Sequence, residues 1–426
     1  MDPSVALVRT HRSFRWYWLG QSISSAGSQV TVLALPLVTA LALDGSPADV
    51  GAVATAAMLP YLLFSLVAGH LLEGRQGRQT MVPADLAQAV LLALVPLAAA
   101  TGWLTVPLLA VIAFLAGTAA LVFGVSAFAY VPSLVERRDL AAANRAVQGS
   151  RTVTEVAGPG LAGLLVGALG PAAAMAVDAL SYLASALGVA MGRPARPPAR
   201  AEDPGEGAGE ERVRVTTGLR ILFRDRHLRA LTVHAAAYNL AEEVFLINLV
   251  LWAVQDQDVP ASAYGLALAM AGVGGLVGTL SALRLADRLG FGRAFAASLV
   301  LSCGVPVLVA GWPLHGVALA VALGLVMLVS GAGLGNANVY SLTLRQTLIP
   351  PTQLSRSAGA YTQVMYGSIP LGSALGGLVG ETLGTRVGVL LGGVGIALSA
   401  APMLTRSVRS LRLDLSATAP AEAAAD

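Results

Sequence analysis

The chain has 426 residues, of which 55% are hydrophobic and 12% are charged, and its mean hydropathy is +0.70. A soluble protein of this length would expose far more apolar surface than water tolerates. The composition therefore excludes an ordinary soluble protein and indicates an integral membrane protein. The net charge of +3 gives no reason to expect a nucleic-acid partner, because the positive residues follow the expected membrane topology.

Long apolar runs follow one another along the chain, each near the roughly 20 residues with which an α-helix crosses a bilayer. They lie at about 14–43, 49–72, 80–101, 104–131, 141–169, 172–191, 228–254, 261–286, 293–312, 315–344, 355–383 and 386–405. The first run is too long for the core of a cleaved signal peptide. We therefore expect twelve transmembrane helices.

The arginines test this topology, because cytoplasmic loops accumulate positive charge. All 27 basic residues are Arg. With both termini in the cytoplasm, every Arg except Arg151 and Arg386 falls at the inner side of a plasma membrane. The outer loops carry acids instead, namely Asp44, Asp49, Asp256, Asp258 and Glu381.

Polar segments divide the chain into two halves. The segment 193–226 is rich in Pro, Gly and charge, which is typical of a linker. We expect a six-helix half at 1–192, a cytoplasmic linker at 193–226, a second half at 227–405 and a disordered cytoplasmic tail at 406–426. Residues 219–228, at the end of the linker and the start of the second half, predict a short basic, amphipathic helix on the inner surface.

The two halves repeat each other at an offset of 214 residues. The segment 69–78 corresponds to 283–292, 134–140 to 348–354, and 163–170 to 377–384. The offset is about half the chain, so one six-helix unit has been duplicated and fused. Such duplication is typical of transporters whose binding site lies between the halves.

Two motifs make the chain resemble the major facilitator superfamily over its whole length. Leu285-Ala-Asp-Arg-Leu-Gly290 with Arg293 is similar to the family's loop between helices 8 and 9, and Gly158-Pro-Gly-Leu-Ala-Gly163 is similar to its antiporter motif. The resemblance implies an all-α integral membrane fold with two pseudo-symmetric six-helix halves that rock about a central cavity.

Further segments resemble the macrolide and siderophore exporters among the drug:proton antiporters. They are Phe14-Arg-Trp-Tyr-Trp-Leu-Gly-Gln21, Asp85, Asn144 and Asp178-Ala-Leu-Ser-Tyr182. One departure is Glu73-Gly74, where the family usually has Asp-Arg in the first loop motif.

Acids inside the apolar runs are the candidates for proton coupling, because a charge at a helix centre costs on the order of 3 kcal/mol. Glu242 and Glu243, near the centre of the seventh run, are the first choice. Glu155 is a further candidate, although it lies four residues after Arg151 and could simply pair with it. Asp85 is another, although it could pair with a loop Arg. For Asp178 we expect partial solvation in the outer half of the sixth helix.

Polar residues on facing helices are candidates for lining the substrate cavity. The 214 offset places Glu242 and Glu243 over Ser28 and Gln29, and the family resemblance implies that helices 1 and 7 face each other. The candidates are Gln21, Ser25, Ser28, Gln29, His234, Tyr238, Asn336 and Asn338. The break at Gly158, Pro159 and Gly160 is a candidate hinge in helix 5.

The two loop motifs are candidates for a cytoplasmic gate that pairs charges in one conformational state. Its predicted residues are Glu73, Arg75, Arg78, Asp287, Arg288 and Arg293.

Together these features favour a monomeric secondary transporter that exports an apolar or amphipathic small molecule in exchange for protons. One alternative is uptake or facilitated diffusion, with Glu242 and Glu243 binding a cationic substrate. Another is a receptor that keeps the fold without transport. We expect no enzyme activity, no cofactor and no metal site, since the five His residues are scattered, and no ATP-binding loop, since Lys is absent.

Overall fold

The computed structural model describes residues 7–8, 10–71, 77–136, 139–192, 215–350 and 353–411. Within these residues the chain forms helices and no strands. The first bundle contains α2 (Arg12–Leu37), α3 (Pro47–Leu71), α4 (Gly77–Ala100), α5 (Val106–Leu134), α6 (Leu140–Leu169) and α7 (Pro171–Met191). The second contains α9 (Arg226–Leu251), α10 (Ala261–Leu289), α11 (Phe291–Gly304), α12 (Gly316–Leu348), α13 (Leu354–Leu383) and α14 (Thr385–Ser399).

Short helices extend or connect the long ones. They are the π-helices η1 (Val38–Ala42) and η3 (Trp252–Asp256), the 3₁₀-helices η4 (Pro306–Gly311) and η6 (Ala401–Leu404), and the α-helices α8 (Val215–Arg224) and α15 (Arg406–Arg409). The expected amphipathic helix is α8, which packs against α13 and buries Leu222.

Part of the expected tail is also ordered, because α15 packs against α11. The prediction of disorder from 406 is therefore wrong for 406–411. Residues 193–214 and 412–426 lie outside the described residues.

Eleven of the described helical stretches are long and apolar enough to cross a membrane. The remaining long helix, α13, has 30 residues and packs against α3 of the first bundle and α9 of the second. It is rich in Gly and Ser, which suits close packing against these two neighbouring helices. With α13 the two bundles together contain the expected twelve long helices, and the all-α membrane fold is confirmed.

Backbone conformation repeats at the same offset of 214 residues as the sequence. The π-helices η1 and η3 are related by this offset, and so are the left-handed residues Asp44 and Asp258, with φ of 46° and 54°. The glycines that begin α7 and α14, Gly170 and Gly384, have φ of 81° and 90°. The duplication is therefore preserved in loops and helix ends as well as in the helices.

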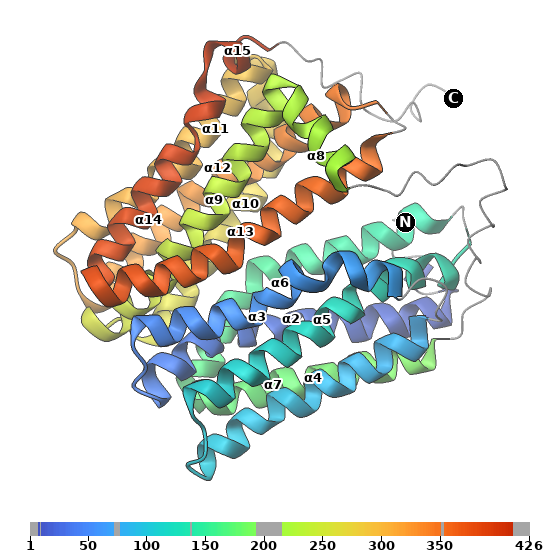
Figure 1. Ribbon diagram of the computed structural model, residues 1–426, viewed down its shortest axis with the longest axis vertical. Coiled ribbons are helices and arrows are strands. Elements are labelled where there is room, and N and C mark those ends of the chain that lie inside the picture. The colour runs from blue at the N-terminus through green and yellow to red at the C-terminus, as the bar shows by residue number, and fades with distance from the viewer. Residues whose placement is uncertain are drawn as a thin grey trace.

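The bundles meet at one end and diverge toward the other (Figure 1). They meet along α3 with α13 and along α6 with α10, where glycines allow close approach. A Cβ atom at Gly51 would lie 2.7 Å from Cα of Gly377, and one at Gly265 would lie 2.6 Å from Cα of Gly163. The 214 offset relates Gly51 to Gly265 and Gly163 to Gly377, so the two contacts are equivalent under the internal symmetry. Together the two contacts close this end of the molecule.

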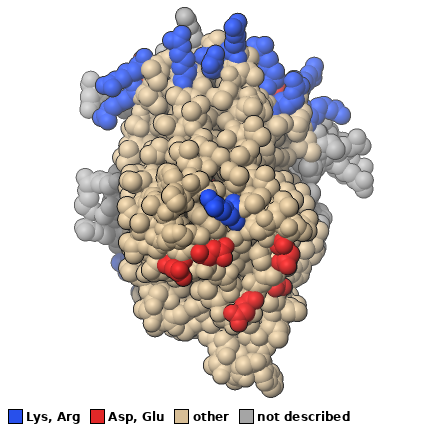
Figure 2. All heavy atoms as spheres, turned by 90° about the vertical axis from the view of Figure 1, so that its left-hand side faces the viewer, with Lys and Arg blue, Asp and Glu red and all other residues tan. Residues whose placement is uncertain are grey.

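Charge distinguishes the two ends. Figure 2 views the end at which the bundles meet and shows acidic side chains gathered there, with one arginine among them. We call this the acidic end; its loops carry Asp44, Asp49, Asp256, Asp258 and Glu381, and Arg386 lies there too. The arginine end is the opposite one, where helices begin or end near Arg12, Arg78, Arg145, Arg293 and Arg406.

Gly265→Ala should loosen the acidic end, because the added methyl group would lie 2.6 Å from both Cα of Gly163 and the carbonyl oxygen of Pro159. Overpacking of this kind costs about 1–3 kcal/mol. Spin labels at Thr101 and His315, which are exposed on loops of the two bundles at this end, should report a longer or broader distance distribution. Gly275→Ala on the same helix is the control, since its nearest neighbour would lie at 3.8 Å. Equal distributions in the two variants would contradict the prediction.

Candidate transport cavity

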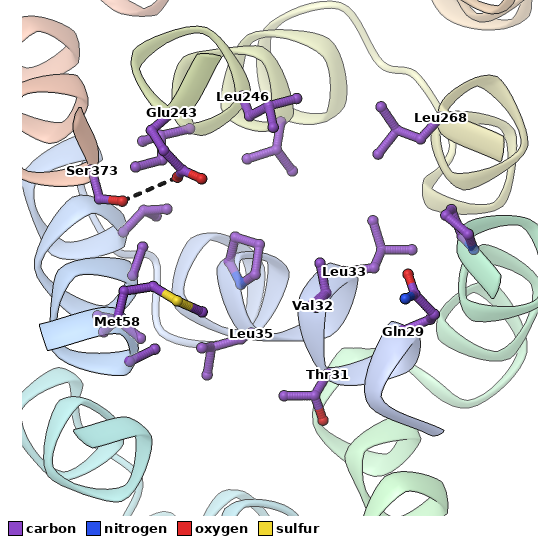
Figure 3. Close-up of a pocket in the computed structure, with 18 of the residues that line it drawn as sticks. Gln29, Thr31, Val32, Leu33, Leu35, Met58, Glu243, Leu246, Leu268 and Ser373 are labelled. Atoms are coloured by element: carbon purple, nitrogen blue, oxygen red, sulfur yellow. Dashed lines mark hydrogen bonds between the residues drawn. The ribbon is translucent and has the colours of Figure 1, made fainter. Parts of the chain in front are cut away.

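A cavity of about 290 Å³ lies between the two bundles. Its walls come from α2, α3 and α6 of the first bundle and from α9, α10 and α13 of the second. Most of the lining side chains are apolar, among them Val32, Leu33, Leu246 and Leu268 (Figure 3). The cavity is therefore an apolar chamber shared by both halves.

The cavity lies on the axis of internal symmetry. Many of its lining residues form pairs related by the 214 offset: Gln29 with Glu243, Val32 with Leu246, Leu33 with Ile247, Pro36 with Val250, Val50 with Tyr264, Ala54 with Leu268, and Pro159 with Ser373. Equivalent positions of the two halves thus face the same space. Most pairs are apolar on both sides, so the pair of Gln29 with Glu243 is where the halves differ in charge.

Glu243 is the acid that lines this cavity. The Ser373 hydroxyl on α13 donates a hydrogen bond to its Oε2 at 3.0 Å. Figure 3 shows Glu243 and Gln29 on opposite sides of the apolar chamber. No described residue forms an ion pair with Glu243. A single carboxyl group therefore faces an apolar space between the two halves.

Glu242 has a different environment, although it is the next residue. The Tyr238 hydroxyl donates a hydrogen bond to its Oε1 at 3.2 Å, and Glu242 is not among the residues that line the cavity. Neighbouring residues of an α-helix point about 100° apart, since a turn has about 3.6 residues. The helix therefore separates the two glutamates, which sequence reasoning treated as a pair.

Most of the other predicted cavity residues lie inside one half or the other. Four of them bond within their own bundle: Gln21 to Ser185, Ser28 to Tyr182, His234 to the Ser399 carbonyl, and Asn336 to the Ala332 carbonyl. Ser25 is half-buried and Asn338 is exposed, and neither lines the cavity. Of the polar candidates only Gln29 lines the cavity.

The remaining coupling candidates lie away from the cavity. Glu155 accepts a hydrogen bond from Arg151 Nε at 3.0 Å, and both side chains are exposed. This is the intrahelical pairing that its spacing allowed. Asp85 is buried and accepts a 2.6 Å hydrogen bond from Ser185. The expectation of a loop arginine as its partner is wrong for the described residues, because α4 turns Asp85 inward against α7.

Asp178 is the acid that sequence reasoning misjudged. It is fully buried, and the Thr31 and Ser181 hydroxyls donate hydrogen bonds to its carboxylate. The expected partial solvation is wrong, because the side chain points into the bundle rather than toward the outer surface. The polar run Ser181-Tyr182 with Ser185 on the same helix was the signal that could have located it.

The predicted gate lies at the arginine end, where the bundles diverge. Glu73 and Arg75 fall outside the described residues. Arg78, Asp287, Arg288 and Arg293 are exposed, and none of these four forms an ion pair within the part of the chain that the structure describes. Charge pairing in another state stays a prediction.

The candidate hinge does not interrupt its helix, since α6 is continuous from Leu140 to Leu169. Two of its three residues, Pro159 and Gly160, nevertheless lie where the two bundles face each other. Pro159 lines the cavity, Gly158 lies against the Gln29 side chain, and Gly160 lies near Leu266 of α10. A role in bending stays a prediction.

The fold and the cavity define a membrane transporter with two pseudo-symmetric halves. Residues 5–424 match the model of the transmembrane secretion effector family. The chain therefore belongs to this family of the major facilitator superfamily, which confirms the superfamily resemblance seen in its loop motifs.

Relatives in this superfamily match most of the chain. An uncharacterized MFS-type transporter, y4rN, from Sinorhizobium fredii is 29% identical and covers 85% of this chain and 87% of its own length. The multidrug efflux pump Tap of Mycolicibacterium fortuitum is 27% identical over 85% of this chain and 87% of its own length.

Solved structures share the fold. A bacterial homologue of the iron transporter ferroportin in its inward-facing state has a TM-score of 0.71 at 16% identity, covering 94% of this chain and 99% of that one. The outward-facing state of such a homologue gives a TM-score of 0.58 at 18% identity, covering 92% of this chain and 98% of that one.

Ala54→Trp should weaken ligand binding in the cavity, because the indole would occupy much of its 290 Å³. We expect affinity for ethidium, used as an apolar cationic probe, to fall about tenfold or more, which corresponds to about 1.4 kcal/mol. Fluorescence titration of the purified protein measures this affinity. Ala52→Trp is the control, since Ala52 is exposed on the same helix. Equal affinities of the two variants would show that ethidium binds elsewhere.

Proposed function

We propose that this protein is a secondary active exporter that exchanges protons for apolar or amphipathic small molecules. The observation that carries the proposal is the position of Glu243, whose carboxyl group faces an apolar cavity between the two halves and accepts a hydrogen bond from Ser373. A lone acid in such a place binds either a proton or a cation, because an unpaired charge in an apolar interior is costly.

The arginine end is proposed to face the cytoplasm of the cell that carries the protein in its plasma membrane. The positive-inside rule supports this orientation, as does the concentration of acids at the opposite end (Figure 2). With this orientation the bundles are closed toward the outside and diverge toward the cytoplasm. A cytoplasmic substrate could then enter between the halves.

The lining of the cavity supports the substrate class. A chamber of about 290 Å³ is near the lower end of the roughly 300–1,000 Å³ that small-molecule sites occupy. Its walls offer van der Waals contact to an apolar body, and Gln29 and Glu243 offer polar contacts on opposite sides. The efflux activity named for Tap, which is 27% identical, supports export as the direction.

Coupling follows from competition at Glu243. When the carboxyl group is protonated, the empty cavity contains no charge and the halves can change conformation at low electrostatic cost. A substrate that binds more tightly when the group is ionised promotes release of the proton to water. Proton and substrate then cross in opposite directions on the same carrier.

Glu243→Gln should abolish coupling, because glutamine cannot release a proton. Ethidium transport into liposomes driven by a pH difference, with the membrane potential clamped, should fall about tenfold or more, equivalent to about 1.4 kcal/mol. Exchange of ethidium between equal pH on both sides should be retained, since it needs no net proton movement.

Glu242→Gln is the matched control, because Glu242 lies at the same depth but bonds to Tyr238 inside the second bundle. Its pH-driven transport should stay within a few-fold of the unmodified protein. Unchanged coupling in Glu243→Gln would overturn the role of Glu243. Transport by the unmodified protein without proton movement would instead favour the alternative in which Glu243 only binds a cationic substrate.

Asp287→Asn should favour the state that is open at the arginine end, if the loop residues pair when that end closes. Asp287 has no ion-pair partner among the described residues in the present arrangement. Loss of an exposed pair worth up to about 1 kcal/mol predicts a shift in populations of roughly two- to fivefold. Labelling rates of a cysteine at Leu33 in the cavity would measure it. Asp258→Asn at the acidic end is the control, and equal rates in both variants would contradict a gate at Asp287.

A further inference from the structure

The first bundle contains its own buried acid, Asp178, in contact with the wall of the transport cavity. Asp178 is on α7 and is 0% exposed. Thr31 on α2 donates a hydrogen bond of 2.5 Å to its Oδ2, and Ser181 on α7 donates one of 2.8 Å to its Oδ1. The carboxyl group is thus held between two helices of one bundle.

The packing around Asp178 is built to admit this group. A Cβ atom at Gly27 of α2 would lie 2.7 Å from Asp178 Oδ1 and 2.5 Å from Cβ of Ser181. Any side chain at Gly27 would therefore displace the carboxyl group or its hydroxyl partner. The absence of a side chain there lets α2 approach α7 closely enough for Thr31 to reach Asp178.

The partners of Asp178 allow both of its protonation states. Both are hydroxyl groups, which can either donate or accept a hydrogen bond. Neither is an arginine, a histidine or an amide that would hold the acid ionised. When Asp178 carries a proton, the Thr31 hydroxyl can rotate and accept the hydrogen bond that it now donates.

None of the described residues supplies a compensating positive charge to Asp178. The titratable group that interacts with Asp178 is Tyr182 on α7 itself, and Tyr182 in turn lies near Asp85 on α4 and Tyr61 on α3. The charged pair of α6, Arg151 with Glu155, is exposed and bonded to itself. An ionised Asp178 would therefore be a buried and uncompensated charge.

Thr31 connects this acid to the transport cavity. It is one of the lining residues of the cavity, and Figure 3 shows its hydroxyl oxygen pointing away from the chamber. That oxygen is the atom that bonds to Asp178. Among the described residues of the bundle, Asp85 is the other buried acid; it bonds to Ser185, and neither residue lines the cavity.

We propose that Asp178 is a second proton-binding site of the transport cycle, which exchanges its proton with the cavity through the Thr31 hydroxyl. This inference rests on the proposed proton-coupled export and adds a site in the half that lacks an acid in the cavity wall. A hydronium ion from the cavity gives a proton to the Thr31 hydroxyl while the hydroxyl passes its own proton to Asp178 Oδ2, so that one proton is bound and one water molecule is left in the cavity. Release follows the same steps in reverse.

Proton stoichiometry in liposomes tests the proposal. The protons moved per ethidium should fall in Asp178→Asn, by one if the site is fully coupled, while ethidium affinity stays within a few-fold. Thr31→Val should keep the acid but slow proton exchange with the cavity. Thr39→Val is the control, since Thr39 is a buried threonine of η1 whose hydroxyl donates to the Leu35 carbonyl of its own helical stretch and not to an acid. Unchanged stoichiometry in Asp178→Asn overturns the inference.

Infrared difference spectroscopy provides a readout that does not require transport. Because it compares the unmodified protein with several variants, it does not depend on whether Asp178→Asn alone folds correctly. A change of pH should alter the carbonyl band of a protonated carboxyl group in the unmodified protein and in Glu243→Gln. The band should shift in Thr31→Val and be lost in Asp178→Asn. A band that is unaffected by both changes at Asp178 and Thr31 would overturn the proposal. A protein that moves ethidium without protons would instead overturn the proposed function.

Discussion

The structure depends on the close backbone contact of the two bundles at the acidic end. Gly51 meets Gly377 and Gly163 meets Gly265 at distances that leave no space for side chains. These contacts bring α3 against α13 and α6 against α10, and they hold the cavity between helices of both halves. Because the two contacts are equivalent by internal symmetry, the halves meet as a quasi-symmetric dimer within one chain.

On this symmetric frame the chemistry is asymmetric. The cavity wall is built from equivalent residues of the two halves, but Gln29 in one faces Glu243 in the other. Both copies of the duplicated unit therefore contribute to the wall of the chamber, but only the second copy contributes an acid to it. Asp178 adds a buried acid to the first half, one hydrogen bond behind the wall. Each half would then contribute one proton-binding group, at positions that the duplication does not relate.

Several features followed from sequence because they depend on local composition. Helices that must cross lipid are recognised by the length of an apolar run, and the 214 offset located equivalent elements, down to η1 and η3. The cost of a charge in lipid also singled out Glu242 and Glu243. What local composition does not contain is the rotation of each helix about its axis. In a soluble protein the polar face marks the side toward water, but these helices are apolar on the lipid side and on the packed side alike.

The sequence by itself determined the membrane class, the twelve helices, the duplication and the presence of acids in the apolar interior, because each of these is a property of residue type along one segment. Only the tertiary structure decided which acid lines the cavity and which acids pack inside a bundle. It turned Glu243 toward the cavity and Glu242 toward Tyr238, and it buried Asp178 against Thr31 rather than exposing it. The physical reason is that these environments depend on the angle and depth at which helices distant in sequence pack. In this chain that packing depends on glycines whose partners lie more than a hundred residues away.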